Sequence, residues 1–447
     1  MKAKIQLSDH FSYRKLFKFT LPSIVMMIFS SVYGVVDGFF VSNFVGKGAF
    51  TAINFIMPYL MVLGSVGFMF GTGGSALVSK TLGEGNKEKA VRLFSLLVYA
   101  SIIIGGLLTI LGLFTLRPVA SLLGAEGQLL EESVLYGKYI SFGLIAYMLQ
   151  MEFQSFFITA EKPQLGLIFT VASGVTNMLL DALFVAVFKW GIVGAAVATL
   201  ASQIVGGFGP LLYFFRKNSS LLRLTKTSFD GKALLKTCGN GSSELMSNIS
   251  MSLVCMLYNA QLMRYIGEDG VAAYGALMYV CMIFLAVFIG YGVGIAPVVG
   301  YHFGANNRAE LKNLLKKSLT IISILSVSMF VFGELMAVPL SKLFVGYDEG
   351  LLALTKRAFV LYSFSYLPVG LAIFGSCFFT ALNNGLISAI MSFLRTLVFQ
   401  AAAVILLPLV FPSPVDGIWI SIVVAEFLAA VLTVVFLLAN KKKYGYM

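Results

Sequence analysis

Charged residues, histidine and cysteine are all scarce in this chain of 447 residues. Asp, Glu, Lys and Arg make up only 12% of the sequence, about half of their share in soluble domains. The two histidines and four cysteines form no metal-binding or catalytic-triad pattern, and we expect reduced cysteines. A phosphate-binding GxxxxGK[ST] loop is also missing, which excludes an ATP-driven pump. The composition therefore predicts no enzyme domain and no cofactor.

Hydrophobic residues are abundant, at 58% of the sequence with a mean hydropathy of +0.90. A chain of this composition has no water-soluble interpretation, so we predict an all-α polytopic membrane protein in a lipid bilayer. Each transmembrane helix needs about twenty apolar residues. Twelve transmembrane helices are predicted on this basis, at 16–40, 50–79, 92–115, 132–158, 164–187, 191–214, 236–262, 270–302, 313–334, 354–379, 385–408 and 416–439.

The basic residues predict the orientation in the membrane. The net charge of +12 could suggest nucleic acid, but Lys and Arg lie in short loops between apolar runs, which is the positive-inside pattern. Twelve spans place both termini on one side, and 23 of the 32 basic residues fall on that side. We expect a multi-pass protein of the cell (inner) membrane with both termini cytoplasmic and no nucleic-acid partner.

The two halves of the sequence repeat one another at an offset of 221 residues, which matches Gly83 and Asn86 to Gly304 and Asn307. Because six spans separate equivalent points, the repeats run parallel, about an axis along the membrane normal. This predicts two pseudo-symmetric six-helix lobes with a substrate path between them. The predicted N-lobe, cytoplasmic linker and C-lobe cover residues 1–214, 215–235 and 236–447.

Ionisable residues within the predicted spans are mostly acidic, and such residues are costly in hydrocarbon unless they serve a function. Asn177 and Asp181 stand four residues apart on one helix face. Asp37 and Asp181 both fall in the outer half of the membrane by their distance along the helices. The 221-residue offset maps Asp37 to Tyr258 and Asp181 to Ala402, so the second half lacks these acids. We therefore assign ion coupling to the first half, with a structural hydrogen bond as the alternative.

The sequence resembles the multidrug and toxic compound extrusion (MATE) transporters, particularly the bacterial multidrug efflux branch. The resemblance covers nearly the whole chain and rests first on Asp37, after a proline-bearing first helix. It also rests on residues 83–86 (GEGN) and their repeat at 304–307 (GANN). The most specific part runs from 177–181 (NMLLD) to 194–199 (GAAVAT).

The resemblance implies two V-arranged lobes that export organic cations, driven by inward flow of H+ or Na+. Carried over position by position, it implies a cation site at Asp37, Tyr136, Asn177, Asp181 and Thr199. The residues add two candidates for the substrate cavity, namely Tyr33, one turn from Asp37, and Ser173, one turn from Asn177. Carboxylate, amide and hydroxyl oxygens suit Na+, and burial of paired acids favours protonation, so both ions stay open. The roles of the other intramembrane charges also stay open: Glu152, Glu244, Glu426 and Arg395.

Two other functions deserve comparison with a cation antiporter. A flippase for lipid-linked precursors has a related architecture, but it should line its cavity with Lys and Arg, and only Arg395 lies deep in a span. A channel or membrane receptor belongs to a different class, and the sequence has neither a carbonyl-rich filter segment nor a ring of charges. We expect a monomeric antiporter whose partners are small organic cations.

Overall fold

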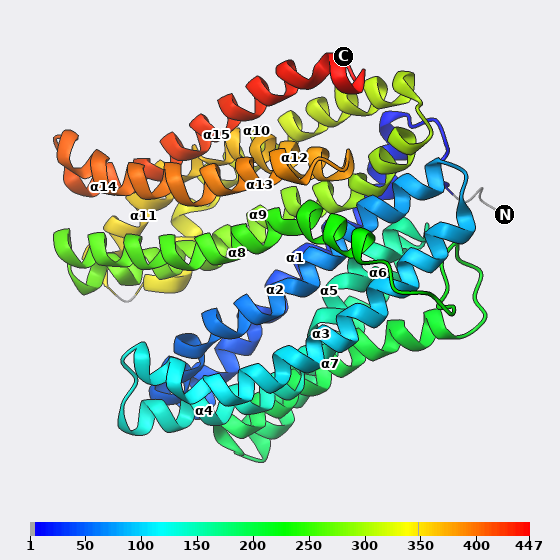
Figure 1. Cartoon of the computed structure of the whole chain (residues 1–447). Helices are drawn as coiled ribbons and strands as arrows, with labels where there is room; N and C mark the ends of the chain where they lie inside the picture. The colour runs from blue at the N-terminus through cyan, green and yellow to red at the C-terminus, as the bar shows by residue number, and fades with distance from the viewer. Residues whose placement is uncertain (1–4, 347) are drawn as a thin grey trace.

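The computed structural model describes residues 5–346 and 348–447, which form fifteen α-helices and three π-helical turns (Figure 1). The first half contains α1 (Tyr13–Phe40), η1 (Val41–Val45), α2 (Lys47–Gly83), α3 (Lys87–Leu122), α4 (Gly127–Phe142), α5 (Leu144–Thr159), α6 (Pro163–Asp181), η2 (Ala182–Val187) and α7 (Gly191–Phe215). The second half contains α8 (Gly231–Tyr265), α9 (Glu268–Gly304), α10 (Arg308–Val345), α11 (Glu349–Ser363), α12 (Tyr366–Ala381), α13 (Gly385–Phe393), η3 (Leu394–Phe399), α14 (Gln400–Val410) and α15 (Pro414–Tyr444).

The twelve predicted spans each fall on one helix or on consecutive helical segments, and the all-α, twelve-helix, two-lobe prediction is confirmed. Nine helices of the described ranges are long and apolar enough to cross a membrane, or ten when α11 and α12 count as one bent span. The two regions outside this set are α8, with a polar run at 239–244, and the pair α4–α5. Two predicted spans are interrupted, at Gly143 between α4 and α5 and by a 51° bend between α11 and α12.

The repeat in the sequence corresponds to equivalent turns in the structure. The side chain of Asn86 accepts a hydrogen bond from the backbone N–H of Lys89 at 3.0 Å and caps α3. Asn307 does the same for the backbone N–H of Glu310 at 3.1 Å and caps α10. Each asparagine therefore satisfies a backbone donor that the first helical turn leaves unpaired, which explains why the pattern recurs in both halves.

The contact between the two lobes is also repeated. Gly83, at the end of α2, packs on the backbone of Tyr301, and Gly304, at the end of α9, packs on the backbone of Lys80. The four residues are pairwise 221 positions apart, so each contact is the pseudo-symmetric copy of the other. Gly73 packs likewise against the backbone of α8. Side chains in place of these glycines would separate the lobes, because the neighbouring backbone leaves no space for a Cβ atom.

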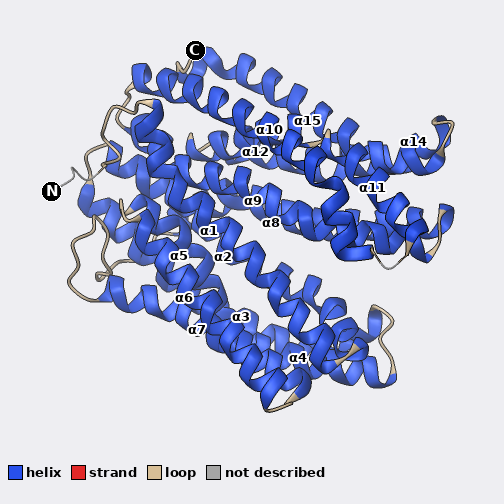
Figure 2. Ribbon diagram, turned by 180° about the vertical axis from the view of Figure 1, so that it is seen from behind, coloured by secondary structure: helices blue, strands red, loops and turns tan. Residues whose placement is uncertain are grey.

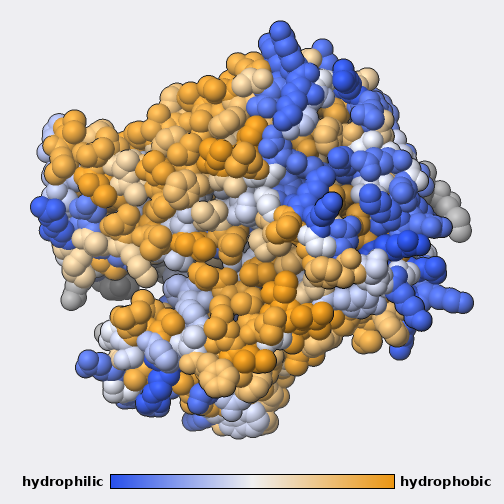
Figure 3. Space-filling model, viewed as in Figure 1, coloured by the Kyte–Doolittle hydropathy of each residue, from blue (hydrophilic) through white to orange (hydrophobic). Residues whose placement is uncertain are grey.

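The first described residues, 5–12, and the C-terminus lie at one end of the molecule, which we call the termini end (Figure 2). Residues 5–12 contact both halves there: the backbone N–H of Leu7 donates to Glu161 at 2.8 Å, and that of Phe11 donates to Glu310 at 2.9 Å. The lobes diverge toward the opposite, far end (Figure 1). Figure 3 shows a hollow between them on that side, an apolar belt around the middle and hydrophilic residues gathered at the termini end.

Candidate functional site

The two predicted acids lie where regular helices change into π-helical turns. Asp37 stands one turn before the end of α1, which continues into η1. Asp181 is the last residue of α6 and is followed directly by η2. Single π-helical turns within α-helices are frequent at functional sites because they re-aim side chains. Hydrophobic periodicity alone carries no signal for these turns, so the sequence predicted the acids but not the local backbone around them.

The structure brings the five predicted coupling residues together from four helices. The carboxyl group of Asp37 on α1 lies beside the side chains of Asn177 and Asp181 on α6. The hydroxyl of Tyr136, on α4, faces Thr199 on α7, with both aspartates close by. Tyr136, Asn177 and Asp181 are at most 2% exposed, whereas Asp37 is partly exposed. Asp37 is therefore the more accessible of the two acids.

The carboxyl groups of Asp37 and Asp181 have few hydrogen-bond partners and no ion-pair partner among the described residues. Among the residues that the structure describes, one oxygen of Asp37, both oxygens of Asp181 and the hydroxyl of Thr199 are buried without a hydrogen-bond partner. None of the ion pairs formed within the described ranges includes either aspartate. Two carboxylates in this position would repel one another and lack solvation. The arrangement is suited to binding a proton or a cation.

The two predicted cavity residues differ in their contacts. Tyr33 packs against Gly174 of α6, and its hydroxyl faces Gln150 of α5. Ser173 is buried, and its hydroxyl donates a hydrogen bond at 2.8 Å to the backbone carbonyl of Ser202 on α7. Tyr33 therefore packs between α5 and α6, whereas Ser173 contributes a hydrogen bond between two helices of the lobe. Their roles in a substrate cavity stay predictions.

A second charged group lies in the C-lobe and is internally paired. The Nε of Arg395, in η3, donates to Glu426 of α15 at 2.8 Å, and Gln400 donates to the other carboxylate oxygen at 3.2 Å. Glu244 of α8 also faces Arg395. The sequence left the roles of both Arg395 and Glu426 open. Arg395 and Glu426 carry opposite charges in two consecutive predicted spans, which could have suggested an ion pair. The sequence alone does not show that the two side chains meet.

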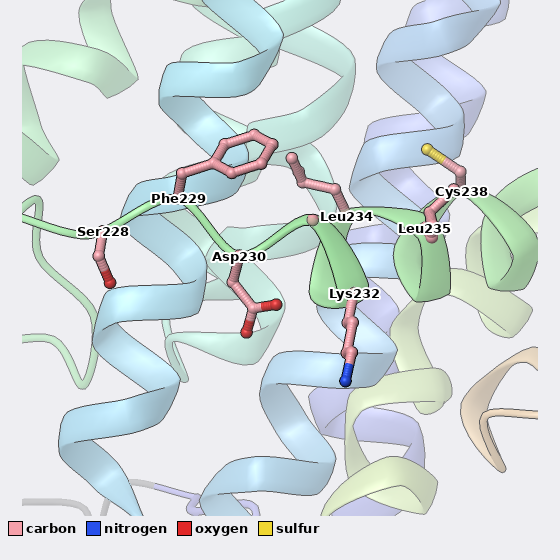
Figure 4. Close-up of a pocket in the computed structure, with 8 residues that line it drawn as sticks. Ser228, Phe229, Asp230, Lys232, Leu234, Leu235 and Cys238 are labelled. Atoms are coloured by element: carbon pink, nitrogen blue, oxygen red, sulfur yellow. The ribbon is translucent and has the colours of Figure 1, made fainter.

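A surface pocket lies away from these charges, at the start of α8 (Figure 4). It has a volume of about 760 Å³ and is lined by residues 228–232, 234, 235 and 238, mostly within the predicted linker. Figure 4 shows Asp230 and Lys232 on the opposite side of the segment from Phe229 and Leu234. Asp230 caps α8 by accepting a hydrogen bond from the backbone N–H of Ala233 at 3.0 Å. This acid therefore has a structural role, and the pocket contains none of the predicted site residues.

Comparison with known proteins points to one family. The sequence profile of the MatE family matches residues 22–183 and 245–405. The chain is 25% identical over 442 residues to the multidrug export protein MepA of Staphylococcus saprophyticus, which covers 96% of this chain and 94% of that protein. MepA of Staphylococcus aureus is 23% identical over 443 residues, with the same coverage of both chains.

Solved structures show the same fold. A crystal structure of MATE in complex with MaL6 superposes with a TM-score of 0.93 at 22% identity over 100% of both chains. An outward-facing multidrug resistance MATE family transporter of the MOP superfamily also gives 0.93, at 21% identity over 100% of both chains. Because the family profile covers most of the sequence in two blocks, one in each half, this chain belongs to the MatE family and is a membrane transporter, not an enzyme.

Proposed function

We propose that this protein is a secondary active antiporter that exports organic cations by rocking-type alternating access, coupled to inward H+ or Na+. The observation that carries the proposal is the uncompensated acid pair Asp37 and Asp181 inside one lobe. Two findings support it. Relatives named multidrug export proteins align over nearly the whole chain, and a hollow separates the lobes at the far end (Figure 3).

The acids provide a simple mechanism for exchange. Ionised Asp37 and Asp181 attract a cationic substrate, since no basic side chain of the described residues pairs with them. Removal of a carboxylate from water and proximity to a second acid both favour its protonated form. A proton from the far end then cancels the charge and weakens the binding of the cationic substrate. Substrate and proton exclude one another at the same group, which is the requirement for antiport.

Sodium is the alternative coupling ion at the same acids. Asn177, Tyr136 and Thr199 add amide and hydroxyl oxygens to the two carboxylates, which is a donor set for a hard cation. The described residues contain no group of three or more His, Cys, Asp or Glu that could hold a metal. A sodium site would therefore depend on the amide and hydroxyl oxygens as well as on the acids.

The lobes in this proposal are the predicted ones, residues 1–214 and 236–447, joined by the linker 215–235. The termini end is cytoplasmic and the far end faces outward, in agreement with the distribution of Lys and Arg. The protein acts as a monomer in the cell membrane. The contacts at Gly83 and Gly304 then close the cytoplasmic side while the outer side is open.

Ethidium transport in reconstituted vesicles tests the function, with a pH gradient and a sodium gradient imposed separately. We expect the pH gradient to drive uphill ethidium transport. Transport driven only by sodium would assign the same acids to Na+. A dye that moves under neither gradient would contradict the antiport of organic cations. Vesicles that contain the double variant Asp37→Asn, Asp181→Asn are the matched control for passive leakage.

A further inference from the structure

One cavity on the outside of the C-lobe has no part in the proposed function. It lies between α10, α12 and α15, has a volume of about 380 Å³, and we call it the C-lobe groove. Figure 1 and Figure 2 both place α10 and α15 at the edge of the C-lobe away from the N-lobe. The groove has a buried apolar floor that includes Ile322, at 2% exposed, and an exposed apolar rim at Val434 and Leu438, at 42% and 50%. Its surface therefore suits a hydrocarbon chain that enters from the bilayer.

The C-lobe groove lies in the half of the membrane next to the termini end. Leu438 stands six residues before the end of α15 at Tyr444, and Leu319 stands eleven residues after the start of α10 at Arg308. These separations are roughly 9 and 16 Å along the helices, comparable with the hydrocarbon of one leaflet, about 15 Å. Gly445 packs against the side chain of Arg308, so α10 and α15 meet at the termini end.

Lysines extend both walls of the groove toward the termini end. On α10, Lys312 and Lys316 stand seven and three residues before Leu319, which places all three on one face of the helix. On α15, Lys441 and Lys442 follow the apolar rim by one to two turns, on the same face as the rim. All four lysines are exposed. The groove is therefore apolar along its length and basic where it reaches the membrane surface.

These lysines have no acidic partner. None of the ion pairs formed within the described ranges includes any of the four. Glu310, in the first turn of α10, lies on the opposite side of the helix from Lys312 and accepts a hydrogen bond from the backbone N–H of Phe11. A basic cluster at the end of a cleft between transmembrane helices attracts anionic lipid headgroups. Charge and shape together thus favour one class of occupant.

We propose that the C-lobe groove binds one anionic phospholipid of the cytoplasmic leaflet. An acyl chain fills the apolar groove, and the phosphodiester lies among the lysines of α10 and α15. Ser323, which lines the groove one turn beyond Leu319, offers a hydroxyl to the ester groups of the lipid. The chain of any phospholipid fits the groove, and the lysines select a negative headgroup. The inference uses the orientation in the proposed function only to name the leaflet, and it does not depend on transport.

Native mass spectrometry of the protein released from detergent tests the inference. Phosphatidylglycerol and phosphatidylcholine with identical acyl chains are added separately, and the dissociation constant of the first bound lipid is measured for each. One lysine near a charged lipid surface contributes about a fivefold gain in affinity. We therefore expect the wild-type protein to bind phosphatidylglycerol at least about fivefold more tightly than phosphatidylcholine.

Two pairs of lysine variants separate this groove from general attraction to a basic surface. The double variant Lys316→Gln, Lys441→Gln should weaken phosphatidylglycerol by about fivefold for each lysine and leave phosphatidylcholine unchanged. The matched control is Lys87→Gln, Lys89→Gln, which removes two exposed lysines from the N-lobe at the same end of the molecule. It should leave the binding of both lipids as in the wild-type protein.

A third variant tests the acyl chain. Val434→Trp narrows the groove and keeps all four lysines, so it should weaken the first binding step of both lipids at least about fivefold. Leu438→Trp, at the other rim position, should give the same result and covers the case in which Val434→Trp fails to fold. Glycerol 1-phosphate, which carries the phosphate without a chain, should not displace the bound lipid.

Three results would overturn the inference: equal affinities of the wild-type protein for the two lipids, an equal loss in the two lysine pairs, or displacement of the lipid by glycerol 1-phosphate at the same concentration. The proposed function fails independently, if wild-type vesicles show no transport of ethidium against a gradient of either ion.

Discussion

The two lobes share one topology, but their polar interiors differ. In the N-lobe, Asp37 and Asp181 lie side by side without a basic partner among the described residues. In the C-lobe, Glu426 has a hydrogen-bond donor on each oxygen, from Arg395 at 2.8 Å and from Gln400 at 3.2 Å. One repeated fold thus contains an uncompensated interior in the N-lobe and a compensated interior in the C-lobe, in which the acid is paired with a base. The fold alone does not decide where an ion binds; the local pairing of charges does.

The equivalent of Asp37 shows the same difference. Tyr258 stands 221 residues after Asp37, and its hydroxyl makes a hydrogen bond of 2.7 Å with Ser421. The position that carries an uncompensated acid in one lobe therefore carries a satisfied hydroxyl in the other. A group with its hydrogen bonds complete has little to gain from a ligand, which is in line with our proposal that ions exchange in the N-lobe. The predictions below separate the two interiors.

The largest effect is expected from the N-lobe acids. Asp37→Asn and Asp181→Asn should each reduce gradient-driven ethidium transport at least about a hundredfold, because the amide can neither release a proton nor attract a cation. Folding should be preserved, since an uncharged amide of the same shape replaces an acid without a counter-charge. Thermal unfolding in detergent and transport in vesicles check both points. Transport at the wild-type rate in either variant would mean that the acid is structural.

The second largest effect is expected on the free energy of unfolding, from the ion pair of Arg395 and Glu426 in the C-lobe. Glu426→Gln removes the carboxylate that is hydrogen-bonded to Arg395 and leaves only Glu244 facing the guanidinium. A buried ion pair broken on one side costs about 3–5 kcal/mol. The double variant Arg395→Met, Glu426→Met removes both charges and should lose much less. Chemical unfolding in micelles measures the difference between the variants. Equal losses in both would show that the pair contributes through packing and not through charge.

These two predictions also show what the sequence could and could not provide. The acids Asp37 and Asp181 were predictable because a charge in an apolar span is conspicuous whatever its partners are. The pairing of Arg395 with Glu426 was not, because it depends on how distant helices pack. The π-helical turns after Asp37 and Asp181 and the break at Gly143 have the same origin. Such local distortions are set by tertiary contacts, and apolar periodicity does not record them.

A third and smaller effect should be equal in the two lobes. Gly83→Ala and Gly304→Ala each place a methyl group against the opposing backbone, and overpacking of this kind costs about 1–3 kcal/mol. Because the contacts are pseudo-symmetric, both variants should raise the open population at the termini end by a similar factor, about tenfold. Spin-labelled cysteines in place of the exposed Lys87 on α3 and Lys312 on α10, in a protein whose four native cysteines are changed to alanine, measure this population by pulsed electron paramagnetic resonance. A large effect of one variant and none of the other would show that one contact alone closes this end.

The smallest effect is expected from the hydroxyl groups around the acids. Tyr136→Phe and Thr199→Ala each remove one polar group that faces the coupling site, and a neutral hydrogen bond contributes about 1 kcal/mol. We expect the concentration of the driving ion that gives half-maximal transport to rise about fivefold, with little change in the maximal rate. Vesicle transport at several ion concentrations measures this shift.

The C-lobe supplies the matched control for these hydroxyls, since Tyr258→Phe breaks a hydrogen bond of similar strength at the position equivalent to Asp37. Its loss should lower stability by about 1 kcal/mol and leave the dependence on the ion unchanged, because Ser421 and not a ligand is its partner. If Tyr258→Phe shifted the ion dependence as far as Tyr136→Phe, the C-lobe would also take part in coupling. The C-lobe would then contain a second ion site, in which Arg395 neutralises Glu426 whenever no ion is bound. The contrast between the lobes is therefore decided by a pair of single-hydroxyl deletions.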